Sequence, residues 1–213
     1  MKVSVIVAVY NGEEFIGRCL RSLVRQSMSQ HEYEIIAVDD GSTDRTAYAL
    51  SQFSGDVRVE THERNRGLPS AINSGLRVAS GKYIVRVDAD DFVNANFLTV
   101  LEIFLDSNLE SQAVACDYLM VDDNEDVISR EDASLRPIAC GVMFRRSAMN
   151  DVGSMNEAYL MNEEREYRRR FEKLYSIDHL PIPLYRYRRH ENNMTNDLER
   201  KNHYDDLLES ADI

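Results

Sequence analysis

The chain has 213 residues, enough for one compact domain that buries roughly 70% of its unfolded surface without a disulfide or metal staple. Apolar residues make up 43% and charged residues 29% of the sequence, which excludes a largely disordered protein. The net charge of -12 argues against nonspecific binding to nucleic acid, because such binding requires cations that neutralise phosphates. The three cysteines are widely spaced, so we expect buried free thiols and no disulfide framework.

In the first 91 residues, strand and helix patterns alternate. Short β-branched runs predict four strands, at Val3–Val9, Ile35–Val38, Val57–Thr61 and Tyr83–Val87. Apolar residues at helical spacing follow the first three of these strands. Strands that alternate with helices of this length predict a parallel, doubly wound sheet. No segment approaches the roughly 20 apolar residues that a membrane span requires, so we expect no transmembrane helix.

Beyond Asn94 the alternation gives way to a less regular pattern. It predicts helices at 97–105 and 162–174, strands at 113–121 and 138–144, an exposed turn at 122–126 and an extended segment at 181–187. The residues after Asn196 are strongly charged, and we expect them to form a surface helix. Because no repeat or low-complexity linker divides the chain, we expect a single domain.

Polar and acidic residues follow each of the four predicted parallel strands. They are Tyr10 and Asn11, Asp39 and Asp40, Arg64, and Asp88 with Asp90. In an open parallel sheet, ligands bind outside the carboxyl ends of the strands. Asp, Asn and Gly also make good turns and helix caps, so any one loop has a purely structural explanation. The four loops together predict a binding site, because carboxylates gather where a cation or a hydrogen-bonding ligand joins them.

The spacing of Asp88 and Asp90 has a specific chemical use. On an extended chain, residues two apart point the same way, so both carboxylates can face one divalent cation. Magnesium and manganese prefer oxygen ligands, and magnesium is often held by one or two carboxylates together with substrate phosphates. A lone D-x-D motif is weak evidence, but this one ends a buried strand beside a second acidic loop. The sequence therefore predicts a cation site at this edge of the sheet.

Several segments together resemble one protein family more specifically than any of them does alone. They are residues 3–11, 38–44, 65–67, 71–75, 80–84, 88–91, 144–146, 163–164 with Arg170, and 184–190. The combination resembles the inverting family-2 glycosyltransferases of the GT-A fold, over nearly the whole chain. This resemblance implies an α/β fold with a mostly parallel, Rossmann-like central sheet flanked by helices. It also implies a single domain with a small acceptor-side subregion.

The resemblance further implies a function for each part of the chain. Residues 1–91 would form the nucleotide-sugar-binding half and residues 92–196 the acceptor and catalytic half, followed by a charged helical tail at 197–213. The implied activity is metal-dependent, inverting transfer of a sugar from a nucleotide-diphosphate donor, with a UDP-sugar favoured, to a hydroxyl acceptor. We expect a role in cell-surface polysaccharide or glycolipid assembly, with a lipid-diphosphate-linked glycan among the candidate acceptors. The expected location is the cytoplasm, with peripheral contact at the inner face of the membrane as one option.

The family's nucleotide-binding motifs carry over to this chain residue by residue. The resemblance implies a nucleotide pocket formed by Ala8, Tyr10, Asn11, Asp39, Asp40, Arg64 and Asp88. Within this pocket, Asp39 and Asp40 match a loop in which a carboxylate accepts a hydrogen bond from the base. Arg64 matches a position that approaches the nucleotide or its phosphates. Ala8 stands where the family often has Thr, so one polar contact to the base would be missing.

The metal and catalytic roles carry over in the same way. Asp90 matches the direct ligand of Mn²⁺ or Mg²⁺, His190 a further metal or diphosphate ligand, and Asp88 a position that reaches the cation through water. Glu163 and Glu164 match an acidic pair whose second member is the general base, with Glu164 in place of the commoner Asp. The reference pKa of a glutamate, about 4.3, predicts that this base is an anion at neutral pH.

Two other functions stay open at this stage. A sugar nucleotidyltransferase has a similar sheet, but it should carry a Gly-rich phosphate loop after the first strand, where Tyr10-Asn-Gly-Glu-Glu14 stands. A catalytically inactive nucleotide-sugar-binding protein is the second alternative, and the intact acidic residues argue against it. The arginines within 165–170 and 186–189 are either charge-paired surface or a site for a phosphorylated acceptor.

Overall fold

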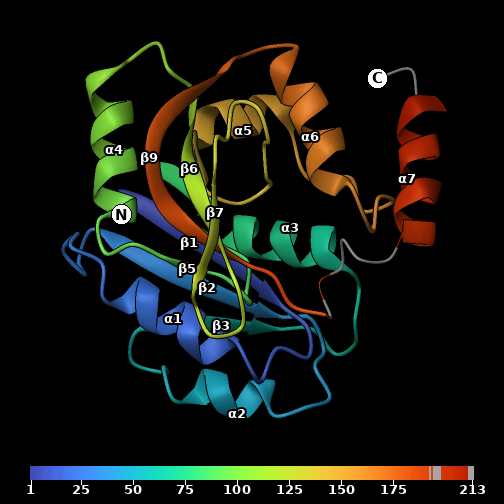
Figure 1. The fold of residues 1–213 in the computed structure, drawn as a ribbon. Coiled ribbons are helices and arrows are strands. Elements are labelled where there is room, and N and C mark those ends of the chain that lie inside the picture. Colours follow the sequence, from blue (N-terminus) through green and yellow to red (C-terminus); the bar gives the residue numbers. More distant parts are fainter. Residues whose placement is uncertain (192, 194–197, 211–213) are drawn as a thin grey trace.

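The computed structural model describes residues 1–191, 193 and 198–210, which form one curled sheet flanked by helices (Figure 1). The strands are β1 (Val3–Val9), β2 (Tyr33–Asp39), β3 (Val57–Thr61), β4 (Tyr83–Arg86), β5 (Phe92–Val93), β6 (Ala113–Val121), β7 (Val127–Glu131), β8 (Val142–Arg145) and β9 (Ile177–Arg188). The helices are α1 (Ile16–Val24), α2 (Thr46–Ser51), α3 (Leu68–Val78), α4 (Phe97–Ser107), α5 (Arg146–Val152), α6 (Glu163–Glu172) and α7 (Leu198–Ser210).

The sheet has a parallel half and a mixed half. Its order is β3-β2-β1-β4-β8-β6-β9-β5, and β7 pairs with β6 outside this path. The strands β1 to β4 are mutually parallel, as the alternating sequence pattern predicts. In the second half, β8 runs antiparallel to both β4 and β6, whereas β9 runs parallel to β6. The short turn between β6 and β7 permits only an antiparallel pair, because parallel neighbours need a long crossover.

Alternate side chains of β1 enter two separate apolar cores, one on each face of the sheet. Val5 and Val7 are fully buried in the core that also holds the apolar stripes of α1 and α4. Ile6 points the opposite way and packs with Ala71 of α3 and Phe171 of α6. Helices therefore cover both faces of the sheet at β1, which explains why this strand is a nearly continuous apolar run. Figure 1 shows α1 and α2 on one side of β1 to β3 and α3 on the other.

The structure differs from the sequence prediction at residues 138–144. The observed strand β8 begins only at Val142, because Gly141 just before it adopts a φ of +75°, outside the range of a strand. A Cβ atom at Gly141 would lie 3.4 Å from the ring of Tyr185, so this loop approaches β9 closely. The segment from 138 to 141 is therefore a loop beside the C-terminal half of the sheet, and its position affects the site described below.

The C-terminal helix α7 lies beside α6. Arg169 of α6 donates a hydrogen bond to the backbone oxygen of Leu208, and Arg165 forms an ion pair with Asp205. The tail predicted at 197–213 begins and ends outside the described residues, and α7 is the part that the structure describes. In the described ranges, the helices are too short or too polar to cross a membrane. The three cysteines are buried free thiols, which confirms that prediction.

Candidate active site

The loops that follow β1, β2 and β3 meet at one edge of the sheet. Asn11 donates its backbone N–H to Ser42 Oγ over 2.9 Å, and its side-chain Oδ1 accepts the backbone N–H of Thr43 at 2.8 Å. Asn11 has a φ of 50°, a left-handed conformation that Asn tolerates better than most residues. Gly41 has a φ of +73°, and a Cβ there would lie 2.5 Å from the backbone of Arg64. The predicted nucleotide loops are therefore held against one another.

The nucleotide-binding candidates on this edge differ in how freely they face solvent. Tyr10 is 47% exposed just beyond β1, and Ala8 is half-buried within β1. Asp39 ends β2 and is 3% exposed. Its Oδ1 accepts the backbone N–H of Ser42 at 2.9 Å, which fixes the start of the following loop.

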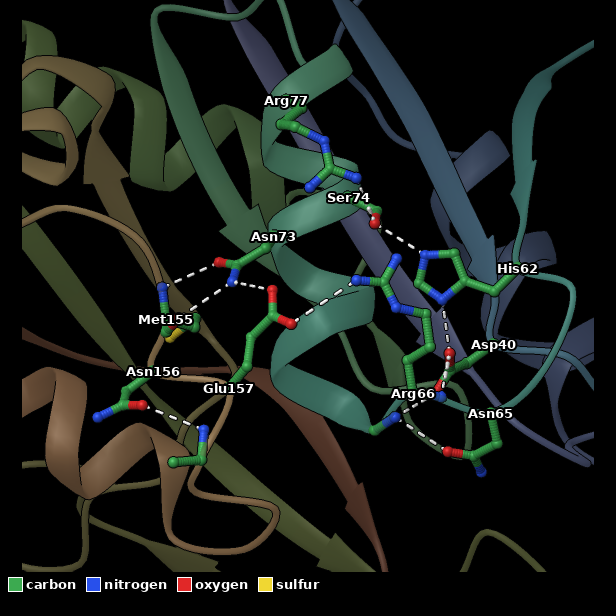
Figure 2. Close-up of polar contacts among 12 residues, drawn as sticks. Asp40, His62, Asn65, Arg66, Asn73, Ser74, Arg77, Met155, Asn156 and Glu157 are labelled. Carbon is green, nitrogen blue, oxygen red and sulfur yellow. Dashed lines mark hydrogen bonds and ion pairs between the residues drawn. The ribbon is translucent and has the colours of Figure 1, made fainter.

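Asp40 is fully engaged within the protein. It is 3% exposed, and it accepts hydrogen bonds from the His62 ring at 2.6 Å and from the backbone N–H groups of Arg66 at 3.0 Å and Gly67 at 2.8 Å (Figure 2). Gly67 is the residue before α3, so this carboxylate lies at the positive end of that helix. Asp40 thus joins the end of β2 to the loop after β3 and to the start of α3.

The contacts of Asp40 continue through His62 to Ser74 of α3. The second ring nitrogen of His62 lies 2.8 Å from Ser74 Oγ (Figure 2). Asp40, His62 and Ser74 thus form a row of hydrogen-bonded side chains like the catalytic triad of serine hydrolases. Ser74 is 5% exposed, however, and its Oγ also accepts a hydrogen bond from Arg77 at 2.7 Å. A nucleophile needs access to its substrate, so we assign this row of contacts to fixing α3 against the sheet.

The acidic residues after β4 do not share one direction. The prediction assumed an extended chain from Asp88 to Asp90, but residues 89 and 90 form a turn in which Asp91 N donates to Asp88 O at 3.1 Å. Because of this turn, the two carboxylates meet different partners. Asp90 Oδ2 lies 3.0 Å from the Nε2 atom of His190, which is 100 residues away in the sequence. The two predicted metal ligands Asp90 and His190 are therefore adjacent.

The Asp90 site fits a divalent cation. Burial of the Asp90 carboxyl and the nearby charge of Asp88 raise the pKa of Asp90 above its usual range. Negative charge is therefore crowded here, and a cation would offset it. Carboxylate oxygens with one imidazole nitrogen suit manganese, which accepts both kinds of ligand. Asp90 and His190, with Asp88 further away, are the residues that would hold it.

Asp91 belongs to the framework of the site. It is 2% exposed, its Oδ2 accepts the Tyr185 hydroxyl at 2.7 Å, and its Oδ1 accepts the backbone N–H of Arg188 at 2.8 Å. Asp88, Asp91 and Cys140 also bring potential ligand atoms within 4.8 Å of one another. Burial raises the pKa of the Cys140 thiol well above its usual range, which disfavours the thiolate that a metal would require.

A second group of potential metal ligands lies in the other half of the sheet. Asp117, Asp132 and His179 bring ligand atoms within 4.8 Å of one another. His179 Nε2 lies 2.7 Å from Asp117 Oδ1, and Arg130 donates to Asp117 Oδ2 at 2.8 Å. Because Arg130 already pairs with Asp117 and His179 is hydrogen-bonded to it, we interpret the group as a structural polar network.

Arg86 links the acidic residues after β4 to the start of α6. Its Nε donates to Asp88 Oδ1 at 2.6 Å, and its Nη1 donates to Glu163 Oε1 at 2.9 Å. The Arg86 side chain is only 13% exposed, and that of Glu163 only 4%. The two predicted groups, donor-side and catalytic, thus share one buried ion-pair network. We did not predict a role for Arg86 from the sequence. The signal that could have indicated one is that Arg86 is the charged residue in the otherwise apolar run Tyr83–Val87.

Glu164 follows in the first turn of α6 and has an unusual ionisation. Burial, and then the charge of Glu163, raise the pKa of Glu164 to about 7. The reference value led us to expect an anion at neutral pH, but the structure places this carboxyl near its midpoint there. A general base is most effective when its pKa lies near the working pH. Glu164 also lines a cavity of 240 Å³ between the sheet and helices α3, α5 and α6.

Most of the predicted C-terminal arginines are paired with acidic groups. Arg168 donates to Glu172 at 2.6 Å and Arg170 to Glu166 at 2.7 Å, each one helical turn apart. Arg188 is buried and donates to the backbone oxygen of Asp90 at 3.0 Å. These contacts favour the charge-paired interpretation for the arginines concerned.

Comparison with known proteins assigns the chain to a family. The sequence model described as Glycosyl transferase family 2 matches residues 4–191. The chain is 42% identical over 102 residues to the poly(ribitol-phosphate) beta-glucosyltransferase of Bacillus spizizenii, a match that covers 46% of this chain and 16% of that protein. It is 36% identical over 111 residues to the poly(ribitol-phosphate) beta-N-acetylglucosaminyltransferase TarS of Staphylococcus aureus, covering 51% and 19%. The chain thus matches less than a fifth of the length of these two relatives.

Solved structures share the fold. The crystal structure of Staphylococcus aureus TarS 1-349 in complex with UDP-GlcNAc superposes with a TM-score of 0.79 at 23% identity, covering 100% of this chain and 68% of that one. The mannosyltransferase PcManGT from Pyrobaculum calidifontis, in complex with GDP-Man and Mn²⁺, gives a TM-score of 0.75 at 18% identity, covering 95% and 61%. At these identities the likeness concerns the fold alone, and it confirms the fold class predicted from the sequence.

Proposed function

Because this chain belongs to glycosyl transferase family 2, we propose that it transfers a sugar from a nucleotide-diphosphate donor to a hydroxyl acceptor, inverting the anomeric carbon. One observation carries this proposal: Arg86 joins Asp88 of the D-x-D motif to Glu163, the neighbour of Glu164. The residues proposed for donor binding and for proton transfer thus lie around one buried guanidinium group, that of Arg86. We favour a UDP-sugar as donor, since a structure with this fold was solved with UDP-GlcNAc.

In the proposed complex, the nucleotide lies across the loops after β1, β2 and β3. Its base would contact Asp39, with Ala8, Tyr10 and Asn11 around it, and Arg64 would approach the phosphates. Asp39 suits the base contact better than Asp40, because Asp40 already accepts three hydrogen bonds within the protein. We therefore propose that Asp40 acts on the nucleotide indirectly, by fixing the loop that carries Arg64.

A divalent cation, Mn²⁺ or Mg²⁺, is proposed at Asp90 and His190, with Asp88 reaching it through water. Such a cation would stabilise the negative charge that develops on the departing nucleotide diphosphate. Two observations support this assignment: the close approach of Asp90 to His190, and the Mn²⁺ that accompanies GDP-Man in the complex of the mannosyltransferase.

Glu164 is the proposed general base. As the acceptor oxygen bonds to the anomeric carbon, the bond from that carbon to the diphosphate oxygen breaks, and Glu164 takes the hydroxyl proton. Glu163, held by Arg86, would orient the first turn of α6 and so the Glu164 carboxylate. A single displacement of this kind inverts the anomeric centre. The acceptor is proposed to belong to a cell-surface polymer or glycolipid, handled in the cytoplasm or at the inner face of the membrane.

A panel of nucleotide sugars tests this function directly. We expect one or more UDP-sugars, together with Mn²⁺, to raise the melting temperature and to release UDP when an acceptor is present. Glu164→Gln should bind donor normally and lose transfer by roughly 100-fold or more. Lack of stabilisation by any nucleotide sugar, in a protein shown to be folded by circular dichroism, would refute the proposal.

A further inference from the structure

The cavity beside Glu164 is large, and most of its wall is apolar. It has a volume of 240 Å³, whereas about 150 Å³ is enough to hold benzene in a dry protein cavity. Ile6 and Ile84 form its sheet side, Ile72 and Leu76 its α3 side, and Met149 its α5 side. The cavity is partly open at the surface of the protein, so a small molecule can enter it.

Polar groups line the α6 side of the cavity. Glu164 lies one helical turn before Tyr167 on the same face of α6, and both residues line the cavity. Arg165 and Arg168 of α6 and Arg86 of β4 also line it. The α6 side therefore presents a carboxylate and guanidinium groups to a space whose remaining wall is mostly apolar.

The opposite wall is fixed in place. Met155 lines the cavity, and Asn73 of α3 holds its backbone on both sides (Figure 2). Met155 N donates to Asn73 Oδ1 at 2.9 Å, and Asn73 Nδ2 donates to Met155 O at 3.0 Å. Asn73 also donates to Glu157, which ties the same loop to α3. These contacts fix the loop that carries Met155 against α3.

We propose that this cavity is an acceptor subsite, which binds an apolar group of the acceptor while the reacting hydroxyl lies at Glu164. The Glu164 carboxylate and the neighbouring guanidinium groups select this occupant over an apolar protein segment, because hydroxyl groups of an acceptor can hydrogen-bond to them. The acceptor is therefore amphipathic, with an alkyl or ring substituent near the hydroxyl that is glycosylated. The acceptor role rests on the proposed function, whereas binding of the apolar group does not.

Primary alcohols are suitable probes, because each joins one hydroxyl to an apolar chain of known length. We would titrate methanol, 1-butanol and 1-hexanol into protein carrying ¹³C-methyl methionine, with UDP and Mn²⁺ present, and follow the signals of Met149 and Met155. Each added methylene contributes about 0.8 kcal/mol on burial, so affinity should rise about three- to four-fold per carbon. Affinity that is independent of chain length, or signals that do not shift, would overturn the subsite.

Two variants separate cavity binding from general effects. Ala139→Phe fills the cavity from a half-buried loop position and should weaken 1-hexanol binding ten-fold or more. Leu174→Trp adds similar bulk at an exposed position outside the cavity and should change nothing. Unchanged 1-hexanol binding in folded Ala139→Phe would place the alcohol outside the cavity and overturn the subsite.

The acceptor role has its own readout. Incubation with the accepted UDP-sugar and 1-hexanol should yield the hexyl glycoside, detected by mass spectrometry, in the unmodified protein and in Leu174→Trp but not in Ala139→Phe. Bound 1-hexanol without glycoside, in protein that hydrolyses the donor, would overturn the acceptor role. Failure to bind or hydrolyse any donor would count against the proposed function, and the methionine signals would still decide whether the cavity binds apolar groups.

Discussion

At the scale of single residues, Arg86 controls the ionisation and position of its neighbours. Its positive charge lowers the pKa of Glu164, against the larger effects of burial and Glu163. It also holds Glu163, which precedes Glu164 in α6. Its guanidinium binds two carboxylates in two directions, a geometry that the single ammonium group of lysine does not reproduce.

We therefore predict that Arg86→Lys retains the fold but lowers the turnover rate roughly ten-fold, with little change in the KM for the donor. Arg86→Gln should, in addition, move the midpoint of the pH–rate profile upward, because the charge that lowers the pKa of Glu164 is gone. Both profiles would be measured by UDP release from pH 5 to 9. Arg58→Gln, which removes an exposed arginine of β3 paired with Glu60, serves as the control and should leave the midpoint in place.

Glu164 itself couples activity and stability to pH in opposite directions. Its pKa is about 7 in the folded protein and near 4.5 in the unfolded chain, so the folded state favours the protonated form. The stabilising contribution is fully present below pH 4.5 and is lost as the pH rises through 7. In the proposed mechanism transfer requires the Glu164 anion, so activity should increase over the upper part of the same range.

Glu164→Gln should accordingly be more stable than the unmodified protein at pH 8, by up to about 3 kcal/mol, and equally stable at pH 4.5. Urea denaturation at the two pH values measures this difference, and the same variant should lose transfer at pH 8, where Glu164 of the unmodified protein is an anion. Equal stability at pH 8 would mean that Glu164 titrates with an ordinary pKa. Glu163→Gln is expected to affect transfer less, because Glu163 acts through the position of α6.

At the scale of elements, Asp40 shows how one side chain joins three segments. Its carboxylate fixes the end of β2, the loop after β3 and the start of α3 together. Asp40→Asn replaces one acceptor oxygen by a donor that faces a backbone N–H group. We predict a loss of about 2–4 kcal/mol of unfolding free energy, since a buried donor loses its partner.

Denaturation and UDP titration together distinguish the two acidic neighbours. Asp40→Asn should lose stability and nucleotide affinity in parallel, whereas Asp39→Asn should lose affinity with a smaller change in stability. Asp56→Asn removes one exposed carboxylate in the same half of the sheet and serves as the charge control. Unchanged stability in Asp40→Asn would show that these contacts contribute little.

Local patterns explain why some elements were predicted and others were not. The bounds of β1, β3 and β6 coincide with the predicted ranges, because a polar, turn-forming stretch follows each of them. The strand β5 has two residues and α5 has seven, and such short segments show no period. The sequence also predicted that Asp40 lies at this edge of the sheet. It does not indicate which groups donate hydrogen bonds to the Asp40 carboxylate.

At the scale of the whole molecule, the site depends on contacts between distant parts of the chain. The sequence predicted that acidic loops gather at one edge, and the parallel half of the sheet follows from the same alternation. The pairs Arg86–Glu163 and Asp90–His190 join residues 77 and 100 positions apart. They depend on the mixed order β4-β8-β6-β9, and no local signal specifies that order.

The pair of Asp90 and His190 connects the two halves of the chain, so cation binding there should stabilise the whole fold. With UDP and Mn²⁺ we predict a rise in melting temperature for the unmodified protein, because a ligand bound only by the folded state shifts unfolding. Asp90→Asn should abolish most of this rise and weaken Mn²⁺-dependent UDP binding ten-fold or more. EDTA should reduce the unmodified protein to the level of this variant.

His190→Gln should show a smaller loss than Asp90→Asn, since it removes a neutral ligand and leaves the carboxylate. Asp126→Asn removes an exposed negative charge elsewhere and should behave like the unmodified protein. The measurement is calorimetric titration of UDP at fixed Mn²⁺, paired with thermal denaturation of each variant. Metal-enhanced UDP binding that persists in folded Asp90→Asn would place the cation elsewhere, because the remaining carboxylates Asp88 and Asp91 are held by Arg86 and Tyr185.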